Sequence, residues 1–245
     1  MGMETGLSKL WMPLRNGGVA TQLAVDEWES DNHVKGCSSC MGVPNSLPCV
    51  NDKDYDSKVR HIAAGLPPKG SNKLGGWKNN SPAMKKAYEK VLQFVQNPHG
   101  MLVLAGPRGT GKTHLGLMIA EERVAAKAGV LYSKVPRLLM NLRTSLSAQP
   151  PNLGYQEMFD RWVNIPCAVL DDLGQEKDSD WVQESLMLLL DMRYESTMAT
   201  VITTNLDGQG IRERYGSALY DRLMDTETGL VTQVTCNWPS YRQKG

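Results

Sequence analysis

The sequence predicts an α/β fold in which helices cover both faces of a parallel β-sheet. From residue 101 onward, short apolar runs of strand length alternate with longer segments whose apolar residues recur at helical spacing. Strands that alternate with helices in this way form parallel sheets buried on both faces. The chain has 245 residues, of which 41% are hydrophobic, so it can build one mid-sized core with at most a small annex.

The first 75 residues differ in texture from the rest of the chain. Their hydrophobic periodicity is weak, and Gly, Pro, Asn and Asp are frequent. Residues 65–80 read GLPPKGSNKLGGWKNN, which is typical of a linker. We therefore divide the chain into an N-terminal region, residues 1–75, and a main domain, residues 76–245.

The elements of the main domain follow from local patterns. Ser81 can cap the first helix, Pro82 suits its first turn, and apolar residues then recur at helical spacing up to residue 95. The predicted strands are residues 101–105, 130–133, 168–170, 200–204 and 229–236. The further predicted helices run from the loop after the first strand to about residue 127, and over 136–147, 155–163, 181–194 and 217–224. Cys167 and Cys236 lie in apolar, strand-like segments and are expected to be buried, inert thiols.

A glycine-rich loop follows the first strand. Residues 106–113 read GPRGTGKT and match the P-loop pattern G-x-x-x-x-G-K-[ST] between a strand and a helix. The glycines let backbone N–H groups face phosphate oxygens, the lysine supplies charge to the β- and γ-phosphates, and the threonine hydroxyl binds Mg²⁺. We therefore expect ATP and Mg²⁺ as ligands. The candidate nucleotide-binding residues are Gly106, Pro107, Arg108, Gly109, Thr110, Gly111, Lys112, Thr113 and His114.

Two carboxylates end the third predicted strand, CAVLDD. Beside a P-loop, Asp171 would hold Mg²⁺ together with Thr113, and Asp172 would position or deprotonate the attacking water. The alternative is an ordinary pair of aspartates between a strand and a turn. The next strand ends in VITTN, where Asn205 can sense the γ-phosphate or the attacking water, unless it only begins a turn.

Three further cysteines cluster in the N-terminal region. Cys37, Cys40 and Cys49 offer three soft ligands of the kind that a tetrahedral Zn²⁺ site needs. His33 is the candidate fourth ligand, with His61 as a second possibility. The alternative is three reduced surface thiols without metal.

Charge and hydropathy exclude several classes of protein. The 27 basic and 26 acidic side chains give a formal net charge of +1, so a nucleic-acid site would have to be a local patch. The first ten residues lack the apolar stretch of a signal peptide, and no run approaches the roughly 20 apolar residues of a membrane helix. We expect a soluble, cytoplasmic protein without a membrane partner.

These motifs together resemble a known family. GPRGTGKT, LDDLG, TTN, the helix with YDRL and the terminal NWPSYR are similar to the DnaC/DnaI helicase-loader branch of the AAA+ ATPases, of which IstB is a close relative. The resemblance covers about residues 62–245 and implies a five-stranded P-loop NTPase core of the AAA+/ASCE type. It also implies that Arg222 is an arginine finger and Arg242 the sensor 2 arginine. Without the resemblance, Arg222 would be interpreted as a solvated helix residue or as the partner of Asp221 or Asp225.

One position departs from the family pattern. Loaders of this type carry an arginine in a G-E-R turn before the finger helix, and here the turn reads Gly216, Ser217, Ala218. Either this contact is lost, or Arg212 or Arg214 replaces it.

The resemblance implies an ATP-dependent loader of a replicative helicase, whose hydrolysis acts as a release switch. Its expected partners are a hexameric DNA helicase, held by the N-terminal region, single-stranded DNA, and further copies of the chain. Lys134, Arg137 and Arg143 are candidates for DNA contacts, or form a solvated helix face. The alternative functions are an IstB-like transposition ATPase that recruits a transposase on DNA, and a small-molecule P-loop kinase.

Overall fold

The computed structural model describes residues 55–67, 77, 81–147 and 154–240. Its centre is a five-stranded sheet with the strand order β2-β3-β4-β1-β5, and all four neighbouring pairs are parallel. The strands are β1 Met101–Ala105, β2 Val130–Lys134, β3 Cys167–Leu173, β4 Ala199–Thr204 and β5 Val231–Thr235. The predicted α/β class is therefore confirmed, and each of the five predicted strands is present.

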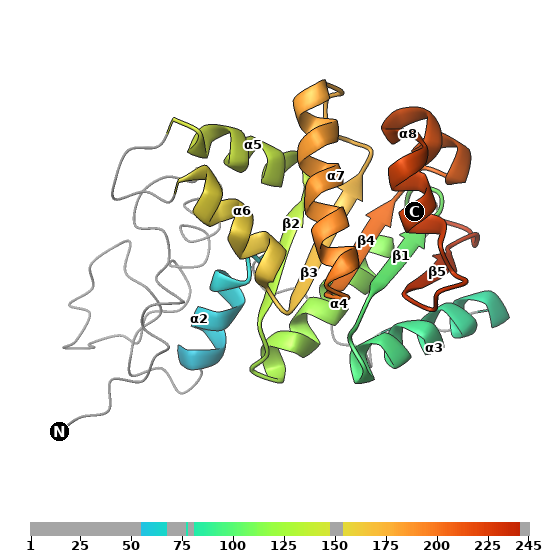
Figure 1. Ribbon diagram of the computed structural model, residues 1–245. Helices are drawn as coiled ribbons and strands as arrows, with labels where there is room; N and C mark the ends of the chain where they lie inside the picture. The colour runs from blue at the N-terminus through green and yellow to red at the C-terminus, as the bar shows by residue number, and fades with distance from the viewer. Residues whose placement is uncertain (1–54, 68–76, 78–80, 148–153, 241–245) are drawn as a thin grey trace.

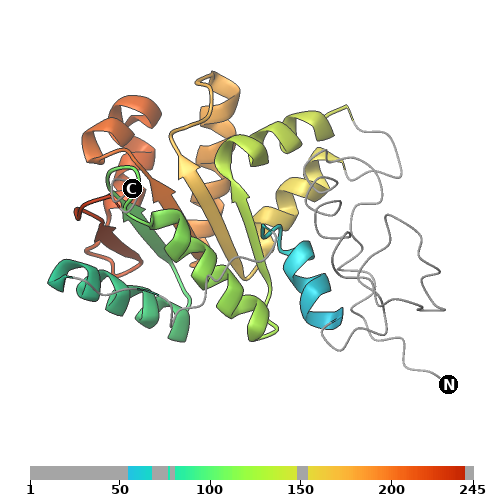
Figure 2. The same cartoon turned by 180° about the vertical axis from the view of Figure 1, so that it is seen from behind.

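Helices cover both faces of this sheet (Figures 1 and 2). One face carries α2 Tyr55–Ala63, α3 Pro82–Gln96 and α4 Lys112–Ala125. The other carries α5 Val135–Ser145, α6 Tyr155–Asn164, α7 Asp180–Glu195 and α8 Gly208–Met224. Two core clusters result, the first between the sheet and the face with α3 and α4, the second between the sheet and the face with α5 to α8. Alternate residues of each strand point to opposite faces, so Leu102 and Leu104 join the first core cluster, while Met101 and Val103 join the second.

Two parts of the fold differ from the prediction. The helix expected at 217–224 is only the second half of α8, which begins at Gly208, is capped by the Asp207 carboxylate, and is kinked at Gly216. The first half was missed because two glycines within three residues oppose a helix, whereas burial of Ile211 stabilises it. On the opposite face, α2 lies in a stretch of weak periodicity and was not predicted.

The segment predicted to be a linker contributes to the core at two points. Leu66 and Trp77 are buried, and both pack in the first core cluster beside Ala64. The packed unit therefore includes residues on the amino side of position 76. The functional division at residues 75 and 76 stays a prediction.

A buried arginine joins elements on the face of the sheet that carries α5 to α8. Arg193 of α7 is fully buried, and its guanidinium donates to the carbonyl oxygens of Trp162, Val163, Ile165 and Ala199 and to the Thr200 hydroxyl. These contacts join the end of α6 to the start of β4, and burial lowers the pKa of Arg193 to about 10.

The two cysteines of the sheet region are buried, as predicted. Burial raises the pKa of Cys167 to about 11 and that of Cys236 to about 12, so both stay neutral thiols near pH 7.

The strand order determines where functional side chains can meet. β4 lies between β1 and β3, and because all strands are parallel, their carboxyl ends share one edge of the sheet. Ligands of open α/β sheets bind at this edge. Among the described helices, none combines the length and apolar character that crossing a membrane requires.

Candidate nucleotide-binding site

The P-loop joins the carboxyl end of β1 to the amino end of α4, as predicted. Gly106, Gly109 and Gly111 have φ angles of 148°, 82° and 92°. A Cβ at Gly106 would lie 2.3 Å from the Cys236 carbonyl oxygen, so only glycine fits there. Since α4 begins at Lys112, the backbone N–H groups of its first turn point toward an anion held in the loop.

Lys112 lies inside this loop. Its side chain is buried, and Nζ donates to the carbonyl oxygens of Gly106 and Pro107, both at 2.7 Å. Thr110 is fully buried and closes the loop from within, because its hydroxyl donates to the Pro107 carbonyl at 3.0 Å. The loop therefore encloses the Lys112 ammonium group and holds it in place with its own carbonyl oxygens.

Asp171 is the centre of the second part of the site. Its carboxylate is fully buried and accepts hydrogen bonds from three hydroxyls on three different elements. Thr113 of α4 and Thr203 of β4 both donate to Oδ1, at 2.8 and 2.6 Å. Tyr132 of β2 donates to Oδ2 at 2.9 Å. Burial and the Asp171 charge raise the pKa of Tyr132 well above its usual range, so the phenol stays a donor at neutral pH.

Asp172 lies beside it with a different geometry. Its φ of 61° is unusual for a residue with a side chain, and it coincides with a register shift between β3 and β4 at Leu170 and Leu173. Its amide donates to the Thr203 hydroxyl at 2.9 Å. Its carboxylate pairs with Lys134 Nζ at 2.8 Å. The two neighbouring aspartates thus face different partners, which suits different chemical roles.

The residues present fit a magnesium ion. Thr113 and Asp171 supply the hydroxyl and carboxylate oxygens that Mg²⁺ prefers, from the motifs that predicted them. Asn205 directly follows β4 and is half-buried. Because Thr204 is paired with Ala105, the residue before the P-loop, Asn205 lies at the same edge of the sheet as the P-loop. Within the described residues, no group of three or more His, Cys, Asp or Glu side chains forms another candidate metal site.

Aromatic side chains support the loop from behind. The Trp238 indole donates to the Thr110 carbonyl at 2.8 Å, and Trp77 packs edge-on against Trp238 and stacked on His114. Burial lowers the pKa of His114. The predicted nucleotide residue His114 is therefore part of an aromatic support. The sequence signal for Trp238 was its place in NWPSYR, whereas nothing in the pattern of Tyr132 indicated its contact with Asp171.

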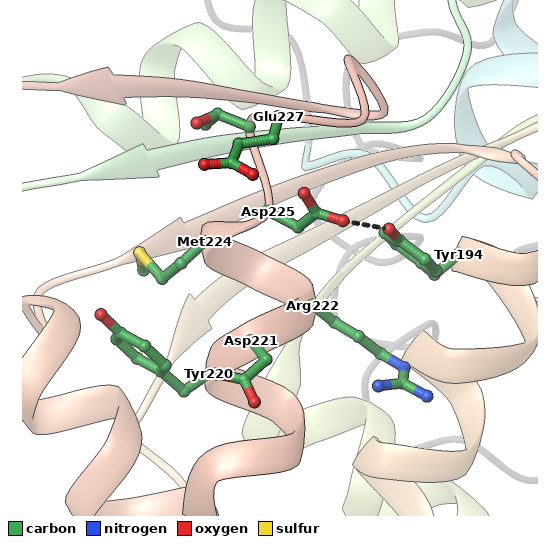
Figure 3. A pocket seen from close by; sticks show the side chains of 8 residues that line it. Tyr194, Tyr220, Asp221, Arg222, Met224, Asp225 and Glu227 are labelled. Atoms are coloured by element: carbon green, nitrogen blue, oxygen red, sulfur yellow. Dashed lines mark hydrogen bonds between the residues drawn. The ribbon is translucent and has the colours of Figure 1, made fainter.

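Arg222 lies apart from this site. It lies on the second half of α8 and lines a hollow of about 520 Å³, together with Tyr194, Tyr220 and Asp225 (Figure 3). Its Nε donates to the Asp191 carboxylate of α7, and its guanidinium lies 5.9 Å from the centre of the Tyr194 ring. The expected alternative partners, Asp221 and Asp225, are not the observed one, since Asp225 accepts from the Tyr194 hydroxyl at 2.6 Å.

The two arginines considered as replacements in the turn before Arg222 have different surroundings. Arg214 is bound to Glu176, whereas the exposed Arg212 lies over the Tyr220 ring. Several other predicted site residues lie outside the described part of the chain, namely Arg242, Cys37, Cys40, Cys49 and His33.

Residues 79–245 match the protein family described as IstB-like ATP binding protein. The chain belongs to this family. The IstB-like chain is 26% identical over 142 residues to a replicative helicase loader DnaC of Buchnera aphidicola (subsp. Baizongia pistaciae), covering 58% of this chain and 56% of the relative. It is 24% identical over 161 residues to the replicative helicase loader DnaC of Escherichia coli (strain K12), covering 64% of each chain.

A third relative has a different description. The insertion sequence ATP-binding protein y4pL of Sinorhizobium fredii is 28% identical over 128 residues, covering 52% of this IstB-like chain and 50% of the relative. The matched part therefore spans from half to about two thirds of the length of these three relatives.

Solved structures show the same fold. A crystal structure of the DnaC helicase loader has a TM-score of 0.58 and 22% identity, covering 67% of the IstB-like chain and 96% of the other. A crystal structure of DnaI has a TM-score of 0.54 and 28% identity, covering 66% and 89%. AMPPCP-bound DnaA from Aquifex aeolicus has a TM-score of 0.55 and 19% identity, covering 68% and 50%. The five-stranded core is thus the one found in AAA+ P-loop proteins.

Proposed function

We propose that this protein is an ATP-dependent loader of a replicative DNA helicase. The observation that carries the ATPase part is the 2.8 Å contact between Thr113 of the P-loop helix and Asp171, beside the enclosed Lys112. Helicase loading is supported by the DnaC relatives and by the 28% identical DnaI structure. The protein would bind ATP and single-stranded DNA and hydrolyse ATP slowly, as a release switch.

Each residue of the site has a distinct task in this reaction. A bound magnesium ion supplies positive charge that neutralises the β- and γ-phosphates. Thr113 and Asp171 would hold it, and Lys112 would turn its N–H groups from the loop carbonyls to phosphate oxygens. Asp172 would orient the attacking water and accept its proton, which requires that Lys134 release the carboxylate. Asn205 would orient the same water.

The proposed partners use other parts of the chain. The N-terminal region, residues 1–75, would hold the hexameric helicase, and copies of the chain would associate through the faces that carry the P-loop and Arg222. For DNA, Arg137 is exposed, whereas Arg143 lies over the Trp181 ring and Lys134 pairs with Asp172. Single-stranded DNA that competes for Lys134 would free Asp172. These processes belong in the cytoplasm.

A transposition ATPase that assembles on DNA and recruits a transposase is the second candidate. It is favoured by the family description and by the insertion sequence relative from Sinorhizobium fredii. A small-molecule kinase would transfer phosphate to a small acceptor, so the absence of such transfer in an acceptor screen would dismiss it.

Asp172→Asn is expected to keep ATP binding and to lose hydrolysis by at least about a hundredfold, because the water loses its proton acceptor. Binding is measured by calorimetry and hydrolysis by phosphate release. The matched control is Asp178→Asn, which removes the same charge from an exposed side chain of the following loop. Equal loss of binding and hydrolysis would contradict the assigned role of Asp172.

The same variant distinguishes the two main functions. Locked with ATP, Asp172→Asn should capture a hexameric helicase from cell extract, and identification of the captured protein by mass spectrometry is the test. Recovery of a transposase instead would favour the second candidate.

We also propose that Cys37, Cys40 and Cys49 bind one Zn²⁺ with His33 as fourth ligand. If so, purified protein contains about one equivalent of zinc by elemental analysis. His33→Ala should lower this content, with His61→Ala as its counterpart for the alternative ligand. Metal below a tenth of an equivalent in the unsubstituted protein would remove the proposal.

A further inference from the structure

Tyr132 contacts Asp171, the carboxylate proposed to hold magnesium, from β2, a strand that carries none of the recognised motifs. Thr113 and Thr203 both bind Oδ1 of Asp171, whereas the Tyr132 hydroxyl binds Oδ2 at 2.9 Å. Rotation about the last side-chain bond of an aspartate is soft. Hydrogen bonds at both oxygens, from β2 on one side and β4 on the other, restrict this rotation.

The backbone of Tyr132 is itself held in place. Its amide donates to the Ala64 carbonyl at 2.7 Å, so the turn after α2 is bound to the outer edge of β2. Gly65 in this turn has a φ of 75°, and a Cβ there would lie 2.6 Å from the Tyr132 carbonyl oxygen. The close approach of the two backbones therefore depends on glycine. The turn after α2 is therefore connected to Asp171 through Tyr132, whose backbone binds the turn and whose side chain binds the carboxylate.

We propose that Tyr132 is a positioning residue that orients the Asp171 carboxylate for the metal. The inference rests on the proposed ATPase function and concerns only how this chain prepares its magnesium site. Thr113 is expected to redirect its hydroxyl oxygen to the metal, which weakens its contact with Asp171. The Tyr132 hydroxyl lies on the other carboxylate oxygen and keeps its contact, so it holds the carboxylate in both states.

The test compares nucleotide binding with and without metal. ADP affinity is measured by calorimetry for Tyr132→Phe in excess Mg²⁺ and in EDTA, using the full chain. The affinity gained from Mg²⁺ should fall about tenfold in the variant, as expected for one lost hydrogen bond to a charged group. Affinity in EDTA should stay unchanged. In hydrolysis assays, the Mg²⁺ concentration for half-maximal rate should rise by a similar factor.

Tyr215→Phe is the matched control. It removes a half-buried tyrosine hydroxyl that donates to the carboxylate of Glu176, whose other hydrogen bonds come from Gly174 and Arg214. This variant should keep the full effect of Mg²⁺ on ADP affinity, whatever its melting temperature.

Three outcomes would overturn the proposal. Equal loss of ADP affinity in Mg²⁺ and in EDTA, or failure of Tyr132→Phe to fold, would make Tyr132 a structural residue only. An unchanged effect of Mg²⁺ would show that Asp171 needs no help from β2. Absence of any ADP binding by the unsubstituted protein would instead contradict the proposed ATPase function, so the two failures are distinguishable.

Discussion

Lys112→Ala is expected to abolish measurable ATP binding. The Lys112 ammonium is the charge that the P-loop motif supplies to the phosphates, and it is already enclosed by the loop, 2.7 Å from two carbonyl oxygens. A hydrogen bond between charged groups contributes about 1.5–3 kcal/mol, and the lysine would donate to two phosphates. Affinity measured by calorimetry should therefore fall by at least about a hundredfold, below the range of the measurement.

The control for this prediction is Lys86→Ala, which removes an exposed lysine from α3. Thermal unfolding of both variants separates loss of binding from loss of the fold. A folded Lys112→Ala protein that binds ATP with unchanged affinity would contradict the assignment of the P-loop.

Arg222→Ala is expected to bind ATP normally and to hydrolyse it about a thousandfold more slowly, as when an arginine finger is lost. α8 starts after the carboxyl end of β4 and ends before the amino end of β5. Because Arg222 lies two residues before the end of α8, it is near the edge of the sheet opposite the P-loop. As an arginine finger it would therefore act on the ATP of a neighbouring subunit, after its pair with Asp191 opens.

A mixing experiment tests this action between subunits. Combining Arg222→Ala with Lys112→Ala places some intact P-loops beside intact arginines, so the ATPase rate should exceed the sum of the separate variants. Mixing Lys112→Ala with Asp172→Asn is the control. Lys112 and Asp172 must both come from the same subunit to form an active site, and every subunit in this mixture lacks one of them, so no activity should be gained. If mixed oligomers form and the mixture of Arg222→Ala with Lys112→Ala gains no activity, Arg222 does not act between subunits.

The nucleotide site was predictable because its signals are local. The P-loop motif occupies eight consecutive residues directly after an apolar strand. Its glycines are required by backbone angles that the loop alone determines. Asp171 and Asp172 end a strand whose apolar run marks it as buried. Parallel strands bring such ends to one edge, so the sequence alone predicts that Thr113 and Asp171 meet.

Other contacts depend on strand order and helix packing. Tyr132 and Lys134 reach the two aspartates only because β2 pairs with β3, a neighbour that lies more than 30 residues later in the chain. The alternative interpretation of Arg222 named its sequence neighbours Asp221 and Asp225 as partners, but its partner is Asp191, on a helix packed beside α8. No periodicity or motif encodes these choices.

Local chemistry was thus sufficient for the fold class, the strands and the P-loop, since hydrophobic periodicity and glycine conformation act over a few residues. Tertiary packing decided the rest: the first half of α8, the inclusion of Leu66 and Trp77 in the core, and the orientation of Asp171 and Arg222. These features arise from burial and hydrogen bonding between segments far apart in the chain, where the free energy of packing outweighs local preference.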